Sequence, residues 1–141
     1  MKIISLPKER KNKVKKCILD TNCFLRLFLN DIPEQANQVE EVLEQAKKKK
    51  VEIFVPQIIL FELHFALEKY YHFPKDEVID KLKTLVATEY LKVESQEIFS
   101  TALTLYTQAS TSFVDCFLLA QSQKEKAELF TFDQKLRKSL A

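Results

Sequence analysis

The sequence predicts an α/β fold in which a short parallel sheet is covered by helices on both faces. Short apolar segments suited to buried strands alternate with longer segments of helical periodicity. This alternation is typical of parallel strands joined by right-handed crossovers. Of the 141 residues, 46% are apolar and 30% are charged, which suits one hydrophobic core and leaves too little chain for two ordinary domains. We therefore expect one domain over residues 14–141, preceded by a basic lead-in over residues 1–13.

The first half of the domain is expected to contain two strands and three helices. An apolar strand over residues 16–20 is followed by a helix over residues 21–29, and a second strand covers residues 51–55. Residues 34–50 form an amphipathic helix, because their apolar positions recur at i, i+3, i+4 and i+7: Val39, Val42, Leu43 and Ala46. Pro56 then opens a helix that extends to about Tyr71.

The second half repeats this alternation. A helix after Pro74 buries one apolar face, formed by Val78, Ile79, Leu82, Leu85 and Val86. A weak strand covers residues 90–93, and Ser95 and Ser112 are suited to cap the N-termini of the next two helices. Residues 129–132 read as the last strand, and Asp133 begins a short final helix.

Composition excludes several classes of protein. The chain has no glycine, so it lacks the glycine-rich loops that cradle phosphate in P-loop and Rossmann proteins. No apolar run is long enough to span a bilayer and no secretory signal is visible, so we expect a cytoplasmic protein without a membrane contact. Cys17, Cys23 and Cys116 are odd in number and lack CxxC spacing, which favours reduced core cysteines over disulfides or zinc ligands.

Basic residues are clustered although the formal net charge is only +2. Such clusters attract phosphate even where the net charge is small. For the run Lys47–Lys50 we prefer a simpler explanation, namely that lysines at the C-terminus of a helix interact favourably with its dipole.

Four acidic residues carry the strongest functional signal: Asp20, Glu62, Asp115 and Asp133. Each one interrupts or ends an apolar run, in CILDTN, FELHFAL, SFVDCFLLA and LFTFDQKL. Charged groups are rarely placed against a core unless something compensates them. Clustered carboxylates repel one another, and Mg²⁺ or Mn²⁺ would relieve that repulsion. The four acids therefore predict a shared metal site.

Each acid also has a structural explanation. Asp133 after a strand is suited to cap a helix, Ser112 with Asp115 resembles a capping box, and Asp20 is suited to close a turn. Glu62 is the hardest to explain in this way, because its neighbours on the helix are apolar. We expect either that it points toward the protein or that something binds at this surface. Together with Glu62, the three aspartates favour a functional site.

The contexts DTN and TFD, together with the order and spacing of the four acids, resemble the PIN-domain nucleases. The closest likeness is to the VapC-type toxins of prokaryotic toxin–antitoxin pairs, and it covers residues from Cys17 to Leu140. Two features depart from the pattern, namely a long basic lead-in and a glycine-free loop at Lys126 and Ala127. The resemblance implies a PIN-like three-layer α/β/α sandwich with a short central parallel sheet.

The resemblance also implies a function and a set of site residues. The protein would be a metal-dependent endoribonuclease that hydrolyses RNA phosphodiester bonds, with Asp20, Glu62, Asp115 and Asp133 as both the catalytic and the Mg²⁺- or Mn²⁺-binding residues. Asn22 and Thr131 would support this site through hydrogen bonds. The protein would form a homodimer and bind a cognate antitoxin that inserts a basic side chain among the carboxylates.

Other residues have weaker assignments. Arg26, Lys135, Arg137 and Lys138 are candidates for contacting RNA phosphates, although solvated helix surfaces explain them equally well. His64 and His72 lack the paired spacing of a zinc site and are better read as packing or surface residues. An aromatic-rich segment would contribute to an antitoxin surface or, as we prefer, to a buried helix stripe: Phe61, Phe65, Tyr70, Tyr71 and Phe73.

Two other functions compete with a nuclease. A PIN-like fold without catalytic activity would serve as an RNA- or protein-binding module, but in that case we would expect one of the four acids to be replaced. A phosphatase of the haloacid dehalogenase type is also α/β with aspartates after strands. That chemistry needs two aspartates in a DxD motif, and the sequence Asp20-Thr21-Asn22 does not supply them.

Overall fold

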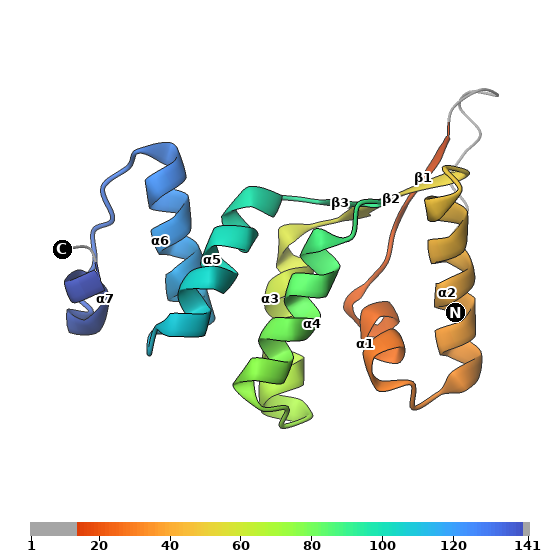
Figure 1. The fold of residues 1–141 in the computed structure, drawn as a ribbon, viewed down its shortest axis with the longest axis horizontal. Helices are drawn as coiled ribbons and strands as arrows, with labels where there is room; N and C mark the ends of the chain where they lie inside the picture. Colours follow the sequence, from red (N-terminus) through yellow and green to blue (C-terminus); the bar gives the residue numbers. More distant parts are fainter. Residues whose placement is uncertain (1–13, 140–141) are drawn as a thin grey trace. The chain divides into compact units, whose positions relative to one another are not determined.

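The computed structural model describes residues 14–139, which form three strands, seven α-helices and one π-helix (Figure 1). In chain order the elements are β1 (Lys15–Ile18), α1 (Thr21–Leu29), α2 (Pro33–Lys47), β2 (Val51–Val55), α3 (Gln57–Phe65), η1 (Ala66–Tyr70), α4 (Lys75–Ala87), β3 (Leu91–Val93), α5 (Gln96–Gln108), α6 (Phe113–Glu125) and α7 (Gln134–Ser139). The predicted lead-in over residues 1–13 lies outside the described residues.

The strands form one parallel sheet in the order β1-β2-β3. Cys17 of β1 is opposite Ile53 of β2, which is in turn opposite Leu91 of β3, and all three side chains are buried. Parallel strands need crossover connections, and here helices provide them. The predicted α/β class with a short parallel sheet is therefore confirmed.

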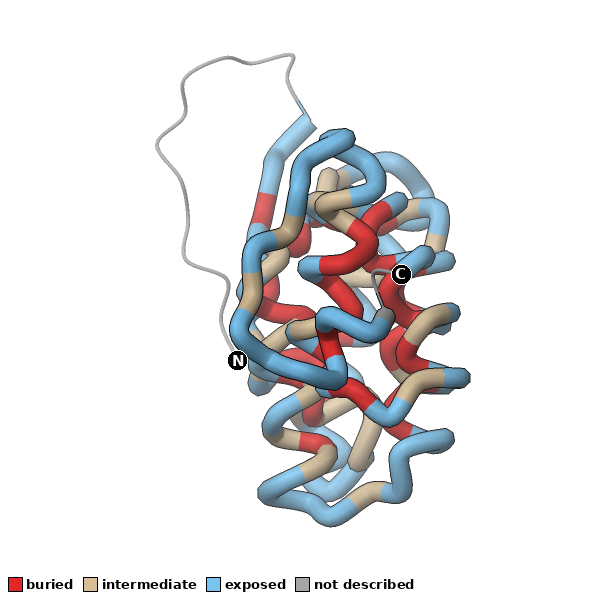
Figure 2. The backbone as a smooth tube through the Cα atoms, turned by 90° about the vertical axis from the view of Figure 1, so that its left-hand side faces the viewer, coloured by how far each residue is buried: buried red, intermediate tan, exposed pale blue. Residues whose placement is uncertain are grey.

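The described residues fall into two compact units, each with a core of its own. Unit 1 comprises residues 14–63 and 88–94, where α1 packs on α2, α2 packs on β2, and Phe24, Ile53 and Leu60 are buried. Unit 2 comprises residues 64–87 and 95–139, where α5 packs on both α4 and α6 around buried Phe99 and Phe113. Buried positions recur along the helices, as expected when one face of each helix packs on a core (Figure 2).

The predicted strand over residues 129–132 is wrong, because these residues have no regular secondary structure. An apolar run becomes a strand only where its backbone groups pair with a neighbouring strand. Here the Arg137 side chain takes up a backbone acceptor instead, since its Nε donates to the Thr131 carbonyl oxygen at 2.7 Å. Phe130 and Phe132 are 77% and 81% exposed and contact each other edge to face.

Two details of the predicted helices also need correction. The helix expected from Pro56 to Tyr71 is α3 followed by the π-helix η1, in which the Tyr71 N–H donates to the carbonyl oxygen of Ala66, five residues earlier. Ser112 caps α6 through its side chain as predicted, with Ser112 Oγ accepting from the Asp115 N–H at 3.1 Å. Ser95 precedes α5 as predicted, but its side chain makes no capping hydrogen bond.

The chain has no glycine, yet five residues in the range 14–139 have a positive φ: Asn30, Lys49, His72, Ser95 and Lys126. Asn30 and Lys126 end α1 and α6 in the left-handed conformation that glycine usually adopts there. At Lys126 this explains how a loop without glycine still ends the helix. A side chain with a Cβ in this region carries local strain.

The three cysteines are free and buried, which confirms the prediction of core thiols. Among the described residues, no helix has the length and apolar character needed to cross a membrane.

Candidate functional site

Asp20 lies between β1 and α1 and caps the N-terminus of α1. Its Oδ1 accepts a hydrogen bond from the Cys23 N–H at 3.1 Å, and the residue is exposed. Asp20 also affects the Cys23 thiol. Burial, and then the hydrogen bond and charge of Asp20, raise the pKa of Cys23 to about 12. Cys23 is also buried, so its side chain belongs to the core and not to the exposed surface around Asp20.

Glu62 lies on α3 and is bound by the first residue of α1. Thr21 Oγ1 donates a hydrogen bond to Glu62 Oε2 at 2.9 Å. Because Thr21 directly follows Asp20, this bond links the chain segment that holds one acid to the side chain of another. Glu62 is exposed, which excludes the first of the two expectations, that it points toward the protein, and leaves the second, that something binds at this surface, as a prediction. The core-facing side of α3 is formed by Ile59, Leu60 and Leu63.

Thr21 is the contact that sequence reasoning missed. Asn22, rather than Thr21, was expected to support the site, and Asn22 is exposed in the first turn of α1. The sequence signal that could have indicated Thr21 was its position as a hydroxyl residue directly after Asp20, the acid that follows the first strand. The sequence did not identify its partner, which comes from a helix 41 positions further along.

Asp115 is half-buried in the first turn of α6. Its backbone N–H is held by Ser112, and its carboxylate is at the end of the helix where the dipole favours negative charge. The capping interaction and the functional reading are thus compatible, because the cap uses the backbone of Asp115 and not its carboxylate.

Asp133 lies in a network that shapes the start of α7. Its Oδ1 accepts from the Leu136 N–H at 3.0 Å, and its own N–H donates to Thr131 Oγ1 at 3.1 Å. Arg137 closes the same segment through the Thr131 carbonyl. Thr131 therefore orients the backbone of Asp133. Its role in supporting a metal site stays a prediction.

The four acids are divided between the two units. Asp20 and Glu62 belong to unit 1, whereas Asp115 and Asp133 belong to unit 2. Within residues 14–139, no three or more His, Cys, Asp or Glu side chains form a group that could hold a metal ion. Each unit supplies two carboxylates, and metal binding by all four stays a prediction.

The basic residues expected to contact RNA differ in accessibility. The Arg26 side chain is only 13% exposed and pairs with Asp31, its Nη1 lying 3.4 Å from Asp31 Oδ2. Lys135, Arg137 and Lys138 are exposed on α7. The residues of α7 are therefore better placed to meet a phosphate than Arg26 is.

His64 is a packing residue, as predicted. Its ring stacks on Phe113 with centroids 4.8 Å apart, and its Nε2 is 2.9 Å from Glu68 Oε2 and 3.1 Å from the Tyr106 hydroxyl. Burial lowers the pKa of His64, an effect that the Glu68 charge partly opposes. His72 is exposed.

The aromatic-rich segment at the end of α3 and in η1 is not a buried stripe. Phe65, Tyr70 and Tyr71 are 62%, 76% and 36% exposed. Our preference for a core role was wrong for these residues, because the buried side of this segment is aliphatic and includes Leu63 and Leu67.

Comparison with known proteins gives two matches. The family model described as "PIN domain" matches residues 17–139, a range that includes all four acids. A protein named VapC ribonuclease, from Aquifex aeolicus (strain VF5), is 26% identical to this chain over 122 residues. The alignment covers 86% of this chain and 90% of that protein.

Proposed function

The chain belongs to the PIN-domain family, and from this premise we propose that it is a metal-dependent endoribonuclease and the toxin of a toxin–antitoxin pair. The observation that carries the proposal is the hydrogen bond from Thr21 to Glu62, beside Asp20. An exposed glutamate held by a neighbouring hydroxyl is oriented without being neutralised by a cation. The similarity of this chain to a VapC ribonuclease over most of both chains also supports the proposed ribonuclease activity.

The residues that would hold Mg²⁺ or Mn²⁺ are Asp20, Glu62, Asp115 and Asp133. All four offer carboxylate oxygens, which hard cations prefer, and all are exposed or half-buried. Cys23 is buried in the core, whereas the four carboxylates are accessible. When bound, such an ion lowers the pKa of a bound water and neutralises charge on the phosphate.

The surrounding residues would position these carboxylates and the substrate. Thr21 orients Glu62, and Thr131 orients Asp133 through its backbone N–H. Asn22 would contribute a further hydrogen bond from the first turn of α1. The exposed cations of α7, Lys135 and Lys138 among them, would contact RNA phosphates.

The proposal includes protein partners and a compartment. A cognate antitoxin would cover exposed apolar surface and bring a basic group to the carboxylates. Ile58, at 56% exposed, and Phe65 lie on α3 one turn on either side of Glu62 and offer such a surface. We also propose a homodimer and a cytoplasmic location, where free cysteines and the RNA substrate are both expected.

The test is cleavage of a pool of structured and unstructured RNAs by purified protein with Mg²⁺ or Mn²⁺, compared with EDTA. The variant pair Asp20→Asn and Asp115→Asn removes one carboxylate from each unit. Its matched control is Glu40→Gln with Asp80→Asn, which removes the same charge at two exposed positions. Circular dichroism verifies that both proteins are folded.

Metal-dependent cleavage that is lost in the first variant and kept in the control would support the nuclease. Absence of cleavage, together with absence of metal binding in calorimetry, would overturn it and favour an RNA- or protein-binding module without catalytic activity. Cleavage that persists in EDTA would contradict the role of the metal.

A further inference from the structure

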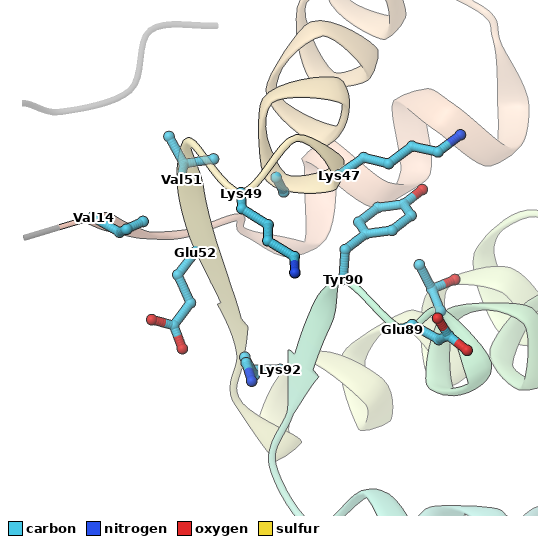
Figure 3. Close-up of a pocket in the computed structure, with 10 residues that line it drawn as sticks. Val14, Lys47, Lys49, Val51, Glu52, Glu89, Tyr90 and Lys92 are labelled. Atoms are coloured by element: carbon cyan, nitrogen blue, oxygen red, sulfur yellow. The ribbon is translucent and has the colours of Figure 1, made fainter.

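A pocket of about 820 Å³ lies in unit 1 at the edge of the sheet where the strands begin (Figure 3). It is lined by Val14 before β1, by Val51 at the start of β2 and by Tyr90 before β3, together with the end of α2. Parallel strands all begin at one edge, so the pocket is at the opposite edge from Asp20, which follows β1. We call it the amino-edge pocket.

The amino-edge pocket lies at the opposite end of β1 from Asp20. Asp20 is six positions after Val14, which corresponds to roughly 20 Å of extended chain. Its volume is in the range usual for ligand sites.

Three lysines from three different elements line the pocket. Lys47 is the last residue of α2, Lys49 is in the turn before β2, and Lys92 is the middle residue of β3. All three are exposed, and none forms an ion pair with another described residue. The helix dipole explains a lysine at the end of α2, but it does not explain Lys92.

The arrangement of the charges favours an anion in the pocket. Lys49 and Lys92 lie between β2 and β3 in the view of Figure 3, whereas Glu52 lies on the side of β2 away from β3. The second acid of the lining, Glu89, lies on the far side of Tyr90 from Lys49. Three lysines and two glutamates line the pocket, so its lining carries a net positive charge.

Tyr90 adds a flat aromatic surface beside these cations. Its ring is half-buried and lies next to Lys47 and above the start of β3 (Figure 3). Stacking of bases on aromatic rings beside a positively charged groove is the usual way that proteins hold single-stranded nucleic acid. A lone inorganic phosphate would make no use of the ring.

Further exposed lysines are close in sequence to the residues that line the pocket. They are exposed at the start of β1 and in the turn after α2: Lys15, Lys16, Lys48 and Lys50. A single nucleotide fills only the pocket, whereas a strand with successive phosphates also uses these outer charges.

We propose that the amino-edge pocket is a second RNA-binding site, which holds a single-stranded part of the substrate away from the carboxylates. Phosphates contact Lys47, Lys49 and Lys92, and one base stacks on Tyr90. The identity of the substrate rests on the proposed nuclease function, but binding at this site requires neither metal nor cleavage. The site would give the enzyme a preference for RNA long enough to reach both edges of the sheet.

The test measures binding of a fluorescent single-stranded RNA 20-mer by anisotropy in EDTA, so that no cleavage occurs. The pocket variant is Lys47→Gln, Lys49→Gln and Lys92→Gln. Its matched control is Lys69→Gln, Lys83→Gln and Lys124→Gln, which removes the same charge from exposed positions in unit 2. Tyr90→Leu tests stacking separately.

If each pocket lysine contacts one phosphate, the slope of log affinity against log salt falls in magnitude by about 2, since each contact on a single strand contributes about 0.7. The same relation gives an affinity loss of about 100-fold at 0.1 M salt. Loss of the stacked base in Tyr90→Leu weakens binding by about tenfold. The lysine control should change affinity by less than threefold, because none of its cations lines the pocket.

Equal losses in the pocket variant and in the control would overturn the proposal, because net charge alone would then explain binding. Unchanged affinity in the pocket variant would overturn it as well. Binding of adenosine monophosphate in calorimetry, without any binding of the 20-mer in anisotropy, would overturn the proposal and identify a free-nucleotide site instead. Protein that cuts no RNA but binds it through these lysines would refute the nuclease and leave this site standing.

Discussion

Replacing Thr21 by valine separates the positioning of Glu62 from the stability of the fold. Valine has the shape of threonine and a comparable helix propensity, so Thr21→Val removes the hydroxyl and little else. The lost interaction is the 2.9 Å hydrogen bond to Glu62 Oε2. The Asp20 cap on α1 uses the Cys23 N–H and remains in place.

The effect on stability should be small. A hydrogen bond to a charged group contributes about 1.5–3 kcal/mol when buried, but Glu62 is exposed and water replaces the lost donor. We therefore expect the free energy of unfolding to fall by about 0.5–1 kcal/mol. A domain with an ordinary stability of about 5 kcal/mol or more stays more than 99% folded after such a loss.

The effect on activity should be larger than the effect on stability. Removing a group that orients a metal-binding carboxylate typically costs 10–100-fold in metal affinity or activity. For an exposed pair we expect about a tenfold fall in kcat/KM and a similar rise in the Mg²⁺ concentration needed for half-maximal activity. Unfolding cannot account for this fall, because the variant remains folded.

The assay combines urea unfolding followed by circular dichroism with initial rates on a fluorophore–quencher RNA at a series of Mg²⁺ concentrations. Thr21→Ser is the matched control, because it keeps the hydroxyl and should retain most of the activity. A valine variant that loses stability but keeps its activity within twofold would refute the positioning role. A serine variant as impaired as the valine variant would show that the methyl group, not the hydrogen bond, matters.

Three further predictions concern stability. Ser112→Ala should lower the free energy of unfolding, measured by urea unfolding, by about 1 kcal/mol, because the Asp115 N–H loses the side chain that caps it. Ser112→Asn is the control and should keep most of the wild-type stability, because asparagine also caps helices. Lys126→Gly should raise the free energy of unfolding by about 0.5 kcal/mol, because the relief of strain in the left-handed conformation exceeds the added entropy of the unfolded chain. A gain of stability in Lys126→Ala would contradict this reasoning, because alanine keeps the Cβ atom. Burial lowers the pKa of His64 in the folded protein, so the unfolded chain binds the proton more readily. The neutral ring therefore contributes stability that is fully present above the unfolded pKa of about 6.5. This stability is lost as the pH falls toward the folded pKa. Urea unfolding from pH 7.5 to 5.5 should therefore show a steeper decline for the wild type than for His64→Gln, and parallel declines would exclude His64 as the cause.

Most elements of the fold could be predicted because their patterns are local. The helical spacing of apolar residues located α2 and α4, and the short apolar runs located β2 and β3. The segment 129–132 has the same composition as those strands, yet its Thr131 carbonyl bonds to Arg137. Its pattern carries no information about whether a partner strand is present, so sequence reasoning had no means to reject it.

The candidate site could be predicted only as far as the residues that break an apolar pattern. Asp20, Asp115 and Asp133 were found in this way. Each also caps a helix or lies in its first turn, so the structural role considered for it in the sequence is present as well. Thr21 breaks no pattern, and its role depends on a contact between two helices distant in sequence. Such a contact is a property of tertiary packing and is not encoded in local spacing.

The absence of glycine has a consequence for the unfolded state. Every residue of this chain carries a Cβ atom, so its unfolded backbone samples fewer conformations than one of ordinary composition, and less entropy is lost on folding. The five residues with positive φ act in the opposite direction, because they strain the native backbone. The protein thus tolerates strain at a few fixed turns, while the stiffness of the rest of the chain favours folding throughout its length.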